Sequence, residues 1–203
     1  EGAAIATFIS QTLVSILIVI YLKKLKPEIA LNIKSLIFDK SILKSILQIG
    51  IPAGIQSIAI TLSNIIIQAN INSFGIDAIA AFTAYFKIEL ILYIPIVALG
   101  QSVIVFIGQN MGAKQFERAD KGFKYCIVGG IISTIIISII LIAISKLLFS
   151  VFSHDTEVIL LGASIVIITF PFYFLYVILE CMSAAIRGIG KSIQPMLIII
   201  ASF

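Results

Sequence analysis

The sequence predicts an all-α protein that crosses a membrane several times, and its composition and uncharged stretches lead to this prediction. Its 203 residues are 60% hydrophobic and 12% charged, whereas a soluble domain carries about 25% charged residues. A helix needs about 20 mainly apolar residues to cross the hydrocarbon of a bilayer. Five stretches of at least this length contain no charge, namely 2–22, 45–76, 90–113, 125–145 and 158–179.

Each uncharged stretch is expected to form a helix, because a lone segment in lipid must satisfy its own backbone hydrogen bonds. The predicted spans cover 2–22, 50–72, 79–108, 122–149 and 158–186, followed by a partial span from 193. Strands of a membrane barrel alternate polar and apolar residues, and these stretches do not. They also lack the polar stripe of a long soluble helix. The pattern therefore argues against both a barrel and a soluble bundle.

Basic residues indicate the orientation of the spans, because cytoplasmic connections carry an excess of lysine and arginine. Twelve of the fourteen basic residues fall in or beside the first, third and fifth connections: Lys23, Lys24, Lys26, Lys34, Lys40, Lys44, Lys114, Arg118, Lys121, Lys124, Arg187 and Lys191. We therefore expect a protein of the plasma membrane with connections 23–49, 109–121 and 187–192 in the cytoplasm. The net charge of +4 is a topology signal. It does not indicate a nucleic-acid surface, which would need basic residues interleaved with aromatics.

The first connection contains an amphipathic segment. Apolar residues at 42, 43, 46, 47 and 49 share one helical face, and Lys40 and Lys44 lie on the other. This pattern predicts a helix that lies on the inner leaflet with its lysines toward anionic headgroups; the alternative is a solvent-exposed tether. The predicted organisation is a span at 1–22, a connector at 23–49 and a helical lobe at 50–203.

Prolines and cysteines add detail to the predicted spans. Pro52 falls in the first turn of its span, where a missing N–H group is harmless. Pro95 and Pro171 fall well inside theirs, and each is expected to remove a backbone hydrogen bond and bend the helix. Cys126 and Cys181 lie in apolar stretches without metal-ligand spacing, so we expect buried free thiols and no metal site.

Five segments carry a resemblance to a known family, in the order in which that family has them. They are GAAIAT (2–7), GIPAGIQS (50–57), FGIDAIAAFTAY (74–85), GQNMGAKQFERADKG (108–122) and RGIGKSIQP (187–195). The chain resembles the multidrug-and-toxin-extrusion (MATE) family, within the superfamily that also holds the oligosaccharidyl-lipid flippases. GQNMGA is the most specific of these segments, and each falls at a predicted membrane boundary.

The resemblance covers nearly the whole chain and implies span six to the start of span eleven of a twelve-span protein. Residues 1–22 would be the last span of an N-terminal lobe that is otherwise missing, and 50–203 most of the C-terminal lobe of a two-lobe, inverted-V transporter. The implied function is secondary antiport, in which amphipathic or cationic, drug-like small molecules leave in exchange for H⁺ or Na⁺. No other cofactor and no enzymatic activity are implied.

Two alternatives to this function stay open. A flippase for lipid-linked oligosaccharides would favour a cationic central cavity, and the one cation away from the ends of the predicted spans is Lys87. An intramembrane enzyme would need a Ser/His, paired Asp or HExxH arrangement in the spans. The single histidine, His154, lies in a predicted outside loop, which makes the enzyme the least favoured alternative.

Ionisable residues inside spans are candidates for ion coupling, because an uncompensated charge in lipid is costly. Three stand out: Lys87, Glu89 and Glu180. Glu180 is interpreted either as a carboxylate that takes up a proton or a cation, or as a structural carboxylate held by Arg187 on the same helix face. Lys87 and Glu89 lie on nearly opposite faces, so we expect Glu89 to face a cavity and Lys87 to extend outward.

Uncharged polar and aromatic residues provide candidates for a substrate cleft. Gln56, Asn64 and Gln68 follow Pro52 on one span, and Tyr173 and Tyr176 follow Pro171 on another. The amides would line the cleft or hydrogen-bond helices together. The tyrosines would stack on flat cations or pack in the core.

The chain departs from the family pattern at one cation site. Some Na⁺-coupled members carry an acidic residue in span seven and an aspartate about eleven residues before the RG turn. Aligned on Pro52 and Arg187, these places hold Ile60 and Tyr176. That site is therefore predicted to be absent, and the resemblance leaves the N-terminal lobe as a place for ion coupling.

Overall fold

A computed structural model describes residues 2–24 and 38–202 of the chain, as two units. Lys26 and Lys34 of the predicted first connection lie outside the described residues. The first unit contains α1 (Gly2–Lys24), whose apolar side chains, such as Phe8 and Leu17, are exposed. Lys23 and Lys24 occupy its last turn, where cations complement the helix dipole and anchor a span at the interface.

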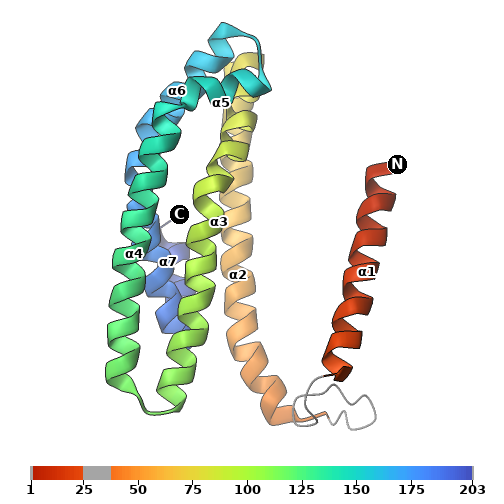
Figure 1. Ribbon diagram of the computed structural model, residues 1–203, viewed down its shortest axis with the longest axis vertical. Coiled ribbons are helices and arrows are strands. Elements are labelled where there is room, and N and C mark those ends of the chain that lie inside the picture. The colour runs from red at the N-terminus through yellow and green to blue at the C-terminus, as the bar shows by residue number, and fades with distance from the viewer. Residues whose placement is uncertain (1, 25–37, 203) are drawn as a thin grey trace. The chain divides into compact units, whose positions relative to one another are not determined.

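The second unit runs from Ser45 to Phe203 and consists of helices joined by short turns (Figure 1). Their bounds are α2 (Lys40–Ile71, whose first five residues belong to the first unit), η2 (Asn72–Phe74), α3 (Ile76–Gly112), α4 (Phe116–Ala143), α5 (Ser145–Phe152), α6 (Thr156–Thr169), η3 (Phe170–Phe172), α7 (Tyr173–Gly188) and α8 (Ile193–Ala201). Across the described residues there is no β-strand. The all-α fold class is therefore confirmed.

Five helical stretches of the described residues are long and apolar enough to cross a bilayer, as the sequence predicts. They are Ala4–Lys24, Lys40–Phe74, Ile76–Gly112, Phe116–Ala143 and Thr156–Gly188. The structure differs at two of the predicted ends. The amphipathic segment from Lys40 runs without a break into its span as one helix, α2. The fourth span ends at Ala143 instead of 149, and α5 follows as a separate short helix.

Side-chain packing explains the separate helix α5. Its Phe149 is completely buried, and its ring fits where Gly162 of α6 has no side chain. A Cβ atom at residue 162 would lie 2.1 Å from the Phe149 ring. The chain therefore turns after Ala143 so that Phe149 can pack against α6.

The two prolines expected to bend a span behave differently, and Pro52, expected in a first turn, lies inside α2. Pro171 lies in the 3₁₀ turn η3 that separates α6 from α7, so the expected bend at Pro171 is present. Helix α3 runs without interruption through Pro95. Of the two cysteines, Cys181 is buried and Cys126 half-buried, and both are free thiols.

Helix α3 forms the centre of the second unit, and its buried residues repeat along most of its length. One core cluster joins it to α4, α5, α6 and η3, and includes Leu92, Phe149 and Phe170. A second cluster joins it to α4 and α7, and includes Val103 and Val177. Several neighbouring helices pack buried side chains against α3. This close packing holds each neighbour at one rotation about its own axis.

Helices α3 and α7 touch backbone to backbone near the GQNMG segment. A Cβ atom at Gly188 would lie 3.0 Å from the Ile104 carbonyl oxygen, and one at Gly108 would lie 3.3 Å from the Gly188 carbonyl oxygen. Gly112, four residues beyond Gly108 on α3, has open space around it. Small residues are common where membrane helices meet, and here Gly108 and Gly188 make the close approach.

We predict that Gly188→Ala destabilises the protein while Gly112→Ala does not. The added methyl group at residue 188 meets a backbone oxygen that cannot move aside, and such overpacking costs about 1–3 kcal/mol. Thermal unfolding of the two purified variants in the same detergent measures the difference. Equal melting temperatures would show that the α3–α7 contact has room for a side chain.

Candidate functional site

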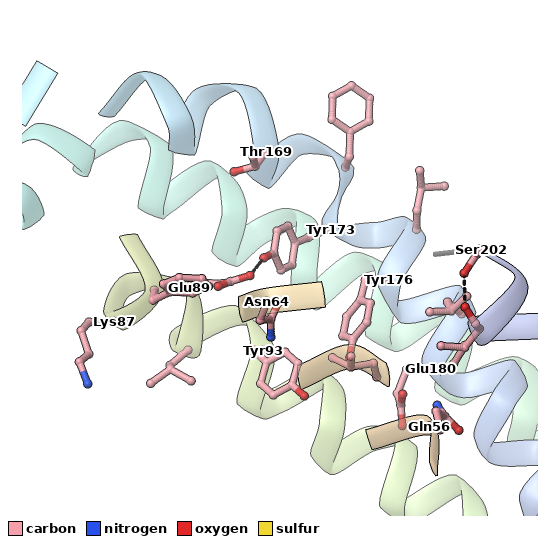
Figure 2. A pocket seen from close by; sticks show the side chains of 17 residues that line it. Gln56, Asn64, Lys87, Glu89, Tyr93, Thr169, Tyr173, Tyr176, Glu180 and Ser202 are labelled. Carbon is pink, nitrogen blue, oxygen red and sulfur yellow. Dashed lines mark hydrogen bonds between the residues drawn. The ribbon is translucent and has the colours of Figure 1, made fainter. Parts of the chain in front are cut away.

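A cavity of about 820 Å³ opens among α2, α3, α7 and α8 of the second unit (Figure 2). Its size is within the range of small-molecule sites. Apolar residues such as Phe86 and Leu179 form part of its wall. Its polar lining consists of Gln56, Asn64, Lys87, Glu89, Tyr93, Thr169, Tyr173, Tyr176, Glu180 and Ser202.

Seven of the eight residues predicted from the sequence line this cavity: Glu180, Glu89, Lys87, Gln56, Asn64, Tyr173 and Tyr176. Gln68 does not, because it lies one turn beyond Asn64 and donates a hydrogen bond to Asn72 Oδ1 at 3.1 Å on the exposed surface. Tyr93 lines the cavity and was not predicted. Its spacing of four residues from Glu89 places both on one face of α3, and that spacing could have identified it.

Glu89 is half-buried in α3 and contacts the first residue of α7. The Tyr173 hydroxyl donates to Glu89 Oε1, and the Tyr85 hydroxyl oxygen lies 3.4 Å from that of Tyr173. Figure 2 shows the Glu89 carboxylate turned toward Tyr173 and the Lys87 side chain extending away from both. Because Tyr173 directly follows the break at η3, the bond joins a cavity carboxylate to the start of α7.

Glu180 is almost buried and forms an ion pair with Arg187 of the same helix. Arg187 Nη2 lies 2.9 Å from Glu180 Oε1, and the two side chains are 15% and 12% exposed. The carboxylate packs against Gly100 of α3, where a Cβ atom would lie 2.6 Å from Oε1. The pairing with Arg187, which one of the two sequence interpretations predicted, is present, and the same carboxylate also lines the cavity.

Three tyrosines form an aromatic wall of the cavity. The rings of Tyr93 and Tyr176 are stacked, with centroids 5.8 Å apart and an interplanar angle of 22°. Tyr173 meets Tyr176 edge-on at 6.5 Å. Tyr173 and Tyr176 also pack against the core clusters, which is one of the two roles that the sequence left open.

The electrostatic character of the lining follows from its few charged groups. Glu89 and Glu180 are acidic and Lys87 is basic. Lys87 is exposed, and Arg187 compensates the charge of Glu180. Of the two carboxylates in the lining, Glu89 is the one without a cationic partner among the described residues.

Known proteins similar to this chain are membrane transporters. The sequence model of the MatE family matches residues 52–203. The chain is 28% identical over 97% of its length to a probable multidrug resistance protein, YoeA, of Bacillus subtilis, and covers 43% of that protein. It is 32% identical over 78% of its length to an FAD transporter of Shewanella oneidensis, and covers 35% of it.

Solved structures show the same fold. A MATE protein crystallised in complex with MaL6 superimposes on 98% of this chain with a TM-score of 0.83 and 18% identity, and 45% of that protein is covered. A transporter of the MOP superfamily from Pyrococcus furiosus superimposes on 77% of the chain with a TM-score of 0.73 and 22% identity, over 35% of its own length. The chain spans less than half the length of these relatives. It belongs to the MATE family of transporters and is an integral membrane protein.

Proposed function

We propose that the chain forms most of one lobe of a secondary antiporter that exports amphipathic or cationic small molecules in exchange for H⁺ or Na⁺. The observation that supports this proposal most directly is the cavity, which combines an aromatic wall with two carboxylates. Flat organic cations are attracted to aromatic faces and to carboxylates. The Bacillus subtilis relative named for multidrug resistance supports a drug-like cargo.

The charge of the lining favours a cationic cargo over the cargo of a flippase. A lipid-linked oligosaccharide carries phosphate groups, which are bound by lysine and arginine. The lining has two carboxylates and one lysine, and that lysine extends away from Glu89. The same reasoning disfavours FAD, the cargo in the name of the Shewanella relative, because its pyrophosphate is anionic.

Exchange needs a group whose protonation or Na⁺ occupancy differs between the states of the transporter. Glu89 fits this requirement better than Glu180. The Glu180 charge is already compensated by Arg187 at 2.9 Å, so an added cation gains less there. Glu89 is bonded to a neutral tyrosine hydroxyl, and a proton or a cation at Glu89 changes the contact that holds the start of α7.

We predict that Glu89→Gln reduces gradient-driven efflux of a cationic dye by at least about fivefold, the lower end of typical coupling between sites. Glutamine keeps the shape of the side chain and a hydrogen-bond acceptor for Tyr173, but it does not take up a proton and lacks the negative charge that attracts Na⁺. Dye efflux from proteoliposomes with an imposed pH or Na⁺ gradient measures the effect in the full-length protein.

Lys87→Gln is the matched control, because it removes a charge from the same helix at the edge of the same cavity. We expect it to retain efflux close to that of the wild type. Full gradient-driven efflux by Glu89→Gln would exclude Glu89 as the coupling carboxylate. If the wild-type protein transports no cation, the proposed function itself is wrong.

We predict that Glu180→Gln and Arg187→Gln each lower the melting temperature, and that Glu180→Gln also weakens efflux. Either single change leaves a buried charge without its partner, which costs about 3–5 kcal/mol. The double variant removes both charges and is expected to recover part of the loss. Thermal unfolding and efflux measured on the same preparations show whether the two quantities fall together. Lost efflux at an unchanged melting temperature would instead assign ion coupling to Glu180.

A further inference from the structure

A second hollow lies between α3 and α4 and contains no group used in the proposed function. It is a groove of about 400 Å³ lined by Phe106, Glu117, Arg118, Lys121, Gly122 and Tyr125. It shares no lining residue with the cavity of Figure 2. Figure 1 shows the short turn between α3 and α4, next to which these residues lie in the sequence. The groove is therefore at a membrane-boundary end of both helices.

The floor of the groove depends on an aromatic ring and a glycine. A Cβ atom at Gly122 would lie 2.2 Å from the Phe106 ring, so the ring lies directly against the backbone of α4. The guanidinium carbon of Arg118 lies 6.0 Å from the centroid of that ring. A cation at this distance from an aromatic face is attracted to it, and the contact holds Arg118 over the groove.

Arg118 is the cation in the groove lining that is available to an anion. The segment 114–124 contains four basic and two acidic residues. Glu117 pairs with Lys121 at 2.6 Å, and Asp120 pairs with Lys124 at 2.6 Å. Arg118 donates to the neutral amide oxygen of Gln115 at 3.2 Å, and within the part of the chain that the structure describes it has no carboxylate partner. Its planar guanidinium has the donor geometry that suits a phosphate.

An apolar strip continues from the groove along α4. Arg118, Lys121, Tyr125, Val128 and Ile132 follow one another at intervals of three or four residues, so they share one helix face. Tyr125, Val128 and Ile132 are all exposed, Tyr125 by 77%. Basic residues and a tyrosine followed by exposed aliphatic residues are the order expected from headgroup depth into the hydrocarbon.

We propose that this groove binds the phosphate of an anionic phospholipid through Arg118, with Lys121 beside it and an acyl chain along the apolar strip of α4. The net positive charge of the segment complements a lipid with net negative charge, and basic pockets beside membrane helices bind such headgroups. Glu117 also faces the groove, but Lys121 compensates its charge. The proposal does not depend on the transport function.

The test is thermal unfolding of the full-length protein in detergent with added short-chain phosphatidylglycerol. We expect this lipid to raise the melting temperature saturably, and phosphatidylcholine to do so much less. Arg118→Gln should weaken the apparent affinity for phosphatidylglycerol about five- to tenfold, the scale of one basic residue near an anionic surface. Lys124→Gln is the control, because it removes a charge on the same helix that does not line the groove, and its affinity should stay near that of the wild type.

Two results with the wild type would overturn the proposal: phosphatidylcholine or inorganic phosphate raises the melting temperature as much as phosphatidylglycerol does at the same concentration. Two results with the variants would also overturn it: Arg118→Gln keeps the wild-type affinity for phosphatidylglycerol, or Arg118→Gln and Lys124→Gln lose this affinity equally. The last result would indicate general attraction between a basic surface and lipid. Arg118 is exposed, so its replacement is expected to leave the fold intact. If Arg118→Gln unfolds, Arg118→Met takes its place, because methionine keeps an apolar stem on the Phe106 ring.

Discussion

The close contact between α3 and α7 is the constraint on which the second unit depends. Gly108 and Gly188 bring the two backbones together, and Gly100 makes room for the Glu180 carboxylate against α3. In lipid there is no hydrophobic force between helices, so packing of this kind determines which faces meet. Because α3 and α7 are fixed in rotation, their polar residues at 89, 173, 176 and 180 point into one cavity.

The same contact gives two carboxylates of one cavity different surroundings. Glu180 has a guanidinium partner and packs against the backbone of α3, which favours a structural role for this carboxylate. Glu89 accepts a hydrogen bond from a tyrosine hydroxyl at the start of α7. Its bonding can therefore change with a proton or a cation without leaving a buried basic side chain unpaired. A helix break next to such a contact, as at Pro171, is a place where a local change can alter the direction of a helix.

The spans, the family and seven of the ten polar residues that line the cavity could be predicted, because uncharged length and ionisable residues in lipid are strong signals. The end of the fourth span could not be predicted, because 125–145 is uncharged throughout. The turn after Ala143 arises from the packing of Phe149 at Gly162. Tyr93 was missed because its role depends on where α2 and α7 sit around α3. The prediction that Gln68 lines the cleft is wrong, because its spacing from Asn64 defines a shared helix face but not where along that face the cavity ends.

The most direct test of the account is linkage between cation binding and the coupling ion in the full-length protein. Tetraphenylphosphonium is a suitable ligand because it has no proton of its own to exchange. The account predicts that its binding in detergent either releases protons or is weakened competitively by Na⁺, and that Glu89→Gln removes this linkage while binding persists. Wild-type binding that is insensitive to both pH and Na⁺ would contradict the assignment of this cavity to ion-coupled exchange.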